Sequence, residues 1–205
     1  MRQSLPAILD AITAAGVRDR DGFPLRATMA AIAQAEGADP NAWVEHDPPT
    51  SRNAPPASGL YQVHRGSWPK IYADTERIRH ARISDRDKMI AMTVLVEPII
   101  EDAYRTAVTT AQTLGRRGIV TTFFDWALFM DATWQAGSPH LAEWAQRTRR
   151  GDARTIVNPP RAIRVEVALR KLAADELGVA PGMGVAVGVL FALGLAAWAL
   201  SQWET

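Results

Sequence analysis

Apolar residues spaced three and four positions apart predict that the chain begins with a helix. The spacing is followed by Leu5, Ile8, Leu9 and Ile12. In an α-helix such positions fall on one face, and a helix with a single apolar face buries that face against a core. Ser4 is a suitable N-cap and Gly16 a suitable stop, so we expect the helix to lie between these two residues.

A second helix is predicted from near Pro24 to about Ala35. One stripe of it is apolar and contains Met29, Ile32 and Ala33. A proline in the first turn and a glycine after the last turn, here Gly37, are typical of helix ends. Glu36 continues the apolar stripe, so its side chain is expected to leave the core at the helix end and to face a cleft.

The connection that follows is expected to be extended and irregular. Residues 37–58 are rich in Pro, Asn, Asp and Ser, which favour turns over regular structure. A long connection inside a domain often carries function. Any sheet is expected to be a small hairpin, formed by residues 57–68.

Helical spacing returns at about Asp85 and continues past Tyr104. Its apolar side contains Met89, Met92, Val96, Ile99 and Ala103. Pro98 lies inside this stretch and removes a backbone donor, so we expect it to kink the helix or to divide it in two. Residues 123–134 are apolar nearly all round, which predicts a helix in the centre of the core. The expected fold class is mainly α.

The last part of the chain is first basic and then apolar. The basic side chains after Trp144 are Arg147, Arg149, Arg150, Arg154, Arg161, Arg164, Arg170 and Lys171. Residues 183–200 carry no charge and are close to the minimum length that crosses a hydrocarbon core of ~30 Å. We therefore predict a domain at residues 1–150, a basic juxtamembrane segment at 151–181 and a transmembrane helix at 182–201. A buried core helix, or a helix in a virion or oligomer channel, is the alternative for the apolar run.

Charge and cysteine content narrow the chemistry. The formal net charge is +1 and the chain has no cysteine. A near-neutral chain gives no signal for nucleic acid, and the basic segment lacks a recognition motif, so we expect no nucleic-acid partner. Its Lys and Arg side chains suit anionic lipid headgroups instead. Without thiolates, and with histidines that lack metal-site spacing, no metal and no cofactor are expected.

Glu36 and the turn that begins at Ser58 are candidate groups for cleaving a glycosidic bond. This cleavage needs a carboxylic acid that stays protonated near neutral pH, and burial against apolar groups raises a carboxyl pKa. The apolar stripe that ends at Glu36 supplies such a setting. Residues 58–63 (SGLYQV) predict a compact turn whose hydroxyl and amide groups can bond an N-acetyl sugar. A solvated surface Glu and a simple strand entry are the alternatives for these two features.

Three short motifs, in this order, resemble those of the soluble lytic transglycosylases, a family of the lysozyme-like superfamily. Residues 34–37 (QAEG) resemble the family's E-S motif, and residues 58–63 resemble its G-L-M-Q-I motif. Residues 133–144 (TWQAGSPHLAEW) resemble its A-Y-N-A-G-x-x-x-V-x-x-W segment. The resemblance covers residues 25–144. It implies a lysozyme-like α domain that cuts the bond between N-acetylmuramic acid and N-acetylglucosamine.

The resemblance also implies roles for individual residues. By motif position, Glu36 is the general acid and then the base. The implied substrate-binding residues are Ser58, Tyr61, Gln62, Trp134 and Gln135. Ser58 and Gln62 would orient the sugar, and Tyr61 would line the same cleft. The family mechanism closes an anhydro ring with the substrate's own muramyl hydroxyl, so it needs no second carboxylate.

Some positions depart from the family pattern and leave a hydrolase as an alternative. Trp134 and Gln135 stand where the family has Tyr and Asn, and Gly37 stands where it has Ser. A hydrolase needs a second carboxylate ~5–9.5 Å from the acid. Glu45 and Asp47 in the Pro-rich connection are the candidates for that role.

The expected protein is therefore a membrane-anchored enzyme whose substrate is the peptidoglycan glycan strand. Residues 1–16 lack the apolar core of a signal peptide, and the basic segment would hold the domain on the cytoplasmic side of a membrane. Delivery by a phage particle, with virion proteins as partners, reconciles this with a wall substrate. The expected location is a virion internal membrane or the bacterial cell envelope. The alternatives are a structural membrane or virion protein that only binds glycan, and a host wall enzyme.

Overall fold

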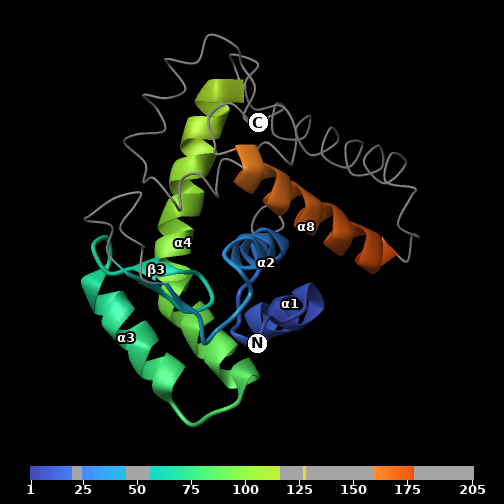
Figure 1. Cartoon of the computed structure of the whole chain (residues 1–205). Helices are drawn as coiled ribbons and strands as arrows, with labels where there is room; N and C mark the ends of the chain where they lie inside the picture. Colours follow the sequence, from blue (N-terminus) through green and yellow to red (C-terminus); the bar gives the residue numbers. More distant parts are fainter. Residues whose placement is uncertain (20–24, 45–55, 116–126, 128–158, 178–205) are drawn as a thin grey trace. The chain divides into compact units, whose positions relative to one another are not determined.

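The structure is a computed structural model that describes residues 1–19, 25–44, 56–115, 127 and 159–177 (Figure 1). The chain divides into two compact units, Met1–Arg20 with Pro24–Ile99 and Asp21–Phe23 with Ile100–Thr205. The described part is mainly helical, as expected. No helix among the described residues has both the length and the apolar composition of a membrane span. The predicted apolar helices at residues 123–134, apart from the buried Ala127, and at 183–200 lie outside the described residues.

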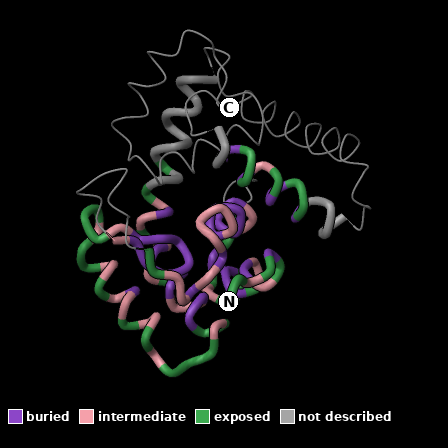
Figure 2. The backbone as a smooth tube through the Cα atoms, viewed as in Figure 1, coloured by how far each residue is buried: buried purple, intermediate pink, exposed green. Residues whose placement is uncertain are grey.

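Helix α1 (Leu5–Ala14) confirms the first predicted helix. The hydroxyl of Ser4 accepts a hydrogen bond from the backbone N–H of Ala7 at 3.3 Å, which caps the helix. Its buried face is formed by Leu5, Ile8, Ala11 and Ile12. Helix α1 packs against α2 (Leu25–Ala35), and buried positions gather along both (Figure 2).

The end of α2 confirms the predicted stop at Gly37. The N–H of Gly37 donates to the carbonyl of Gln34 at 3.2 Å, and the N–H of Ala38 donates to that of Ala33 at 3.0 Å. This pair of bonds is the Schellman motif, which needs a left-handed residue after the helix. Gly37 has φ +112°, so the position favours glycine, and this accounts for the absence of the serine that the resemblance expects.

A three-stranded antiparallel sheet follows α2. Its strands are β1 (Trp43–Val44), β2 (Ala57–Ser58) and β3 (Val63–His64), in the order β1-β2-β3. The β2–β3 pair confirms the predicted hairpin. Strand β1 lies within the stretch predicted as irregular, and residues 45–55 are outside the described part. Trp43 pairs with Ser58, which ties the chain after α2 to the hairpin.

Helix α3 (Pro69–His80) is an addition to the prediction. Thr75 is its one residue with a buried side chain, so the segment has no apolar stripe for a periodicity argument to detect. Pro69 in its first turn, and Arg77, Arg79 and His80 in its last turn, are the local signals of a helix at this place. The helix packs against β2 and β3.

Helix α4 (Asp85–Gly115) is one continuous helix with Pro98 inside it. Of the two outcomes expected at Pro98, a kink or a division, the division does not occur. The carbonyl that loses its helical donor belongs to Val94, whose side chain is 51% exposed, so water can bond that carbonyl instead. The buried face runs through Met89, Met92, Val96 and Ile100. Ile99, which the prediction placed on this face, is only half-buried.

Helix α8 (Pro159–Leu177) occupies part of the predicted basic segment. One face is buried and consists of Ala162, Val165, Ala168, Leu169 and Leu172. The opposite face is exposed and consists of Ile163, Arg164, Val167, Arg170 and Lys171. The segment is thus an amphipathic helix where it is described, with Arg164, Arg170 and Lys171 on the exposed face.

Candidate functional site

Glu36, the predicted general acid, is the first residue after the last turn of α2. Its backbone N–H donates to the carbonyl of Ile32 at 3.0 Å, and Gly37 follows it in the left-handed conformation. Its side chain is half-buried, above a helix whose residues Ile32 and Ala33 are fully buried. The Schellman motif therefore fixes the backbone from which this carboxyl projects.

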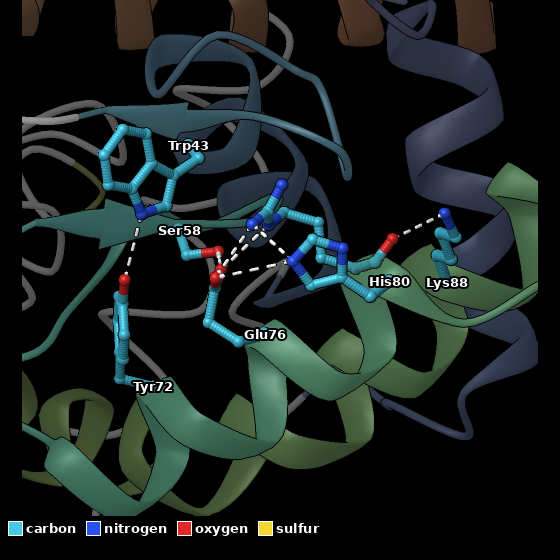
Figure 3. Close-up of polar contacts among 7 residues, drawn as sticks. Trp43, Ser58, Tyr72, Glu76, His80 and Lys88 are labelled. Carbon is cyan, nitrogen blue, oxygen red and sulfur yellow. Dashed lines mark hydrogen bonds and ion pairs between the residues drawn. The ribbon is translucent and has the colours of Figure 1, made fainter.

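Ser58 is fully buried in β2, and its hydroxyl donates to the Oε1 atom of Glu76 on α3 (Figure 3). The contact joins the first residue of the 58–63 motif to a helix that the sequence did not predict. The predicted sugar-orienting hydroxyl is therefore engaged by the protein in this structure. Its role toward a substrate stays a prediction.

Glu76 and Arg79 form a bidentate pair one turn apart on α3. The Nε atom of Arg79 donates to Oε1 at 2.8 Å, and Nη2 donates to Oε2, also at 2.8 Å. The hydrogen bonds from Arg79, helped by the bond from Ser58 and by the charges of Arg79 and His80, lower the pKa of Glu76 despite its partial burial. Glu76 is thus an ionised carboxylate with both oxygens bonded. We call Ser58, Glu76 and Arg79 the Glu76 cluster.

Lys88, on α4, connects the Glu76 cluster to the turn that follows Glu36. Its Nζ atom donates to the backbone carbonyl of Arg79 at 2.8 Å and to Oδ1 of Asn41 at 2.7 Å. Asn41 in turn donates to Oδ1 of Asp85 at 2.8 Å. Lys88 is largely buried, so these partners replace the water that its ammonium group has lost. These hydrogen bonds therefore connect the start of α4 to the end of α3 and to the chain before β1.

Trp43 offers the one aromatic ring near this region that is both exposed and held in place among the described residues. Its indole is 44% exposed, and Nε1 donates to the hydroxyl of Tyr72 on α3 at 3.0 Å (Figure 3). A fixed indole with an open face is suited to stacking on a sugar ring.

Tyr61 is placed in the core and not at a cleft. Its side chain is 1% exposed, and its hydroxyl lies 3.1 Å from that of Thr93 on α4. Burial raises the pKa of the phenol. A ring this buried leaves almost no surface for a sugar, so the predicted cleft-lining role of Tyr61 is not carried into the proposed site.

Gln62 closes the turn between β2 and β3 in a left-handed backbone conformation, with φ +49°. Its backbone N–H and its Nε2 atom both donate to the carbonyl of Gly59, at 3.1 and 2.9 Å. A non-glycine residue with positive φ is uncommon and is kept only where its surroundings hold it. Gln62 therefore belongs to a shaped turn, and its contact with a sugar stays a prediction.

The remaining predicted residues are not in the described part of the structure. Trp134 and Gln135, and the alternative second carboxylates Glu45 and Asp47, all lie outside it. Within the described ranges, no group of acidic or histidine side chains is arranged to hold a metal ion.

Sequence reasoning missed the partner of Ser58. Glu76 and Arg79 stand three positions apart, a spacing that places them side by side on a helix. That spacing was the available signal, but it occurs on many solvated helices and does not show that a serine from a distant strand joins the pair. The hydrogen bond between Ser58 and Glu76 depends on the packing of α3 against the sheet, which the sequence pattern does not reveal.

The described residues thus contain a half-buried carboxyl after a helix, a tightly constrained turn and a bonded carboxylate that supports that turn. Glu36 is the member of this set that can supply an acid group. No family model, no curated protein and no solved structure matches the chain, so the site is interpreted from its own geometry and motifs.

Proposed function

We propose that this protein is a peptidoglycan lytic transglycosylase, with Glu36 as its general acid and base. In the proposed reaction Glu36 protonates the oxygen between N-acetylmuramic acid and N-acetylglucosamine. The same carboxylate then removes the proton from the muramyl C6 hydroxyl, which attacks C1 and closes the anhydro ring. No water is consumed, so a second carboxylate has no step to perform.

The pairing of β1 with β2 is the observation that carries the proposal. The backbone N–H of Gly59 donates to the carbonyl of Ala42 at 2.9 Å, and Trp43 is in register with Ser58. These contacts hold the motif at residues 58–63 against the chain that leaves Glu36. The two motifs that the resemblance assigns to one active site are therefore joined by a short stretch of chain whose far end is bonded to the second motif.

The setting of Glu36 also supports an acid role. The residue follows the buried stripe of α2, and its side chain is half-buried. A partly buried carboxyl beside apolar side chains is the setting in which the pKa of a glycosidase general acid is raised. We further propose that residues 183–200 anchor the enzyme in a membrane and that a phage particle carries it to the wall.

The test is digestion of purified peptidoglycan by the full-length chain in detergent, with wild type beside Glu36→Gln. The substitution keeps the size of the side chain and removes its acid, so product release should fall by at least about 1,000-fold while the fold survives. Mass spectrometry of the products separates the mechanisms. Anhydromuramyl ends support the transglycosylase, whereas reducing ends indicate a hydrolase.

Matched variants complete this experiment. Glu45→Gln and Asp47→Asn remove the alternative second carboxylates, and a transglycosylase should keep its activity in both. Loss in either variant together with reducing ends would transfer the mechanism to a hydrolase. Glycan binding by a wild type that releases no product would instead support the structural protein.

A further inference from the structure

We infer that the Glu76 cluster positions the turn at residues 59–62 for the proposed reaction. The inference rests on the proposed function, because it assigns that turn to the substrate site. Glu76 does not itself react with substrate: Ser58 and Arg79 occupy Oε1, and Arg79 occupies Oε2. It is a positioning residue, which acts through Ser58.

The turn needs such support because its own backbone is constrained. Gly59 has φ +76° and Gln62 has φ +49°, so two of its four residues are in the left-handed region. Within the turn, the carbonyl of Gly59 accepts both bonds from Gln62. Those bonds shape the turn, while the N–H of Gly59 attaches it to Ala42 and the hydroxyl of Tyr61 contacts Thr93 on α4. Ser58, the residue before Gly59, makes the side-chain attachment to α3.

The carboxylate that receives Ser58 is itself fixed. The side chain of Arg79 is only 19% exposed, and it donates two hydrogen bonds of 2.8 Å to the carboxylate of Glu76. Such bidentate pairs fix the plane of a carboxylate as well as its position. The acceptor for the Ser58 hydroxyl therefore has one orientation, and Figure 3 shows the hydroxyl directed at it.

The same group of contacts reaches the chain that follows Glu36. Lys88 holds the carbonyl of Arg79 and the side chain of Asn41, which belongs to the turn after Glu36. The cluster thus links the chain that carries the acid to the turn that is proposed to orient the sugar. A small misplacement between two such elements lowers the rate of reaction more than it lowers binding.

Kinetics of the full-length enzyme on soluble glycan strands test the inference. Ser58→Ala, Glu76→Gln and the double variant are measured well below their unfolding temperatures, and each rate is corrected for the folded fraction. We expect kcat to fall about 10- to 100-fold with KM changed less than about threefold. The double variant should lose little more than either single variant, because Ser58→Ala removes the hydroxyl and Glu76→Gln removes the ion pair with Arg79 that fixes its acceptor.

Asp74→Asn is the matched control. It removes a carboxylate from the same helix, where Asp74 pairs with Arg77 at 2.9 Å and Arg77 is 78% exposed. This variant should keep wild-type kcat and KM. Folded Ser58→Ala and Glu76→Gln enzymes with wild-type kcat, or losses that merely follow the folded fraction, would overturn the inference.

Hydrogen exchange separates this inference from the proposed function. The N–H groups of Gly59 and Gln62 are bonded to Ala42 and Gly59, so a displaced turn exposes them. Their exchange should accelerate at least about tenfold in Glu76→Gln, while amides of α1 keep the wild-type rate. If wild type releases no product, the proposed function fails. The exchange result is read independently of that outcome. Unchanged exchange at the two amides rejects positioning of the turn by Glu76, and accelerated exchange supports it.

Discussion

Individual residues in the 59–62 turn are shaped by short-range sterics that the sequence pattern does not reveal. Gly59 has φ +76°, and a Cβ added to it would lie 2.6 Å from Cγ2 of Thr75 and 3.0 Å from Sδ of Met92. Glycine is therefore favoured at this position for two reasons. The backbone is left-handed, and α3 and α4 approach too closely to leave room for a Cβ atom. A motif match identifies this glycine, but only the packing explains it.

Substituting Gly59 should consequently lower the free energy of unfolding more than substituting a glycine whose added Cβ would meet no other atom. Gly59→Ala is expected to lower the free energy of unfolding by about 2–4 kcal/mol, from left-handed strain and overpacking together. Gly37 has φ +112° and no atom within 4 Å of an added Cβ, so Gly37→Ala should cost only the backbone part, about 1–2 kcal/mol. Urea unfolding of both variants measures the difference. Equal losses would contradict the predicted clash.

Glu76 should give the protein an acid-sensitive part of its stability. Its pKa in the folded state lies below the ordinary value of 4.5, because the ionised form is bonded by Arg79 and Ser58. A lowered pKa contributes stability that is complete above pH 4.5 and is lost as the pH falls through the folded-state pKa. The difference in Tm between wild type and Glu76→Gln should therefore be largest near pH 7 and shrink below pH 4.5. A difference that is independent of pH would exclude this coupling.

At the scale of elements, apolar periodicity predicted those helices that bury a regular stripe. Helices α1, α2 and α4 begin close to their predicted positions, because each packs one face on a core. Helix α3 was missed because it attaches to the sheet mainly through polar contacts, such as those of Tyr72 and Glu76, and polar contacts leave no periodic signal. Strand β1 was missed because two residues are too short to show alternation.

Replacing Pro98 tests how much an interior proline destabilises α4. Its ring leaves the Val94 carbonyl without a helical donor, on a side of the helix where Pro98 and Val94 are both exposed. Pro98→Ala restores that donor, so it should raise the free energy of unfolding by about 1–2 kcal/mol, less than the ~3 kcal/mol helix penalty of proline because the unfolded chain also gains freedom. Thermal unfolding beside Glu97→Ala, which leaves the backbone donors unchanged, measures this. A loss of stability in Pro98→Ala would mean that the proline is needed.

At the scale of the whole molecule, the anchoring role of the C-terminal apolar run can be tested by truncation. Residues 183–200 have the composition of a span and lie outside the described structure. The full chain should partition with membranes, whereas a chain that ends at Gly178 should remain in the soluble fraction and keep its activity. Sedimentation with vesicles measures the partition. A full chain that is equally soluble without detergent would contradict the anchor.

The sequence by itself determined the helical class, both ends of α1, the stop of α2 at Gly37 and the order of the motifs that contain Glu36 and Ser58. Each of these depends on spacing, capping or backbone preference, which act between residues close in the chain. The tertiary structure alone decided that Ser58 bonds Glu76, that Tyr61 is a core residue and that Lys88 links α3 to Asn41. Those contacts join residues distant in sequence, and they form only after the sheet and the helices have packed.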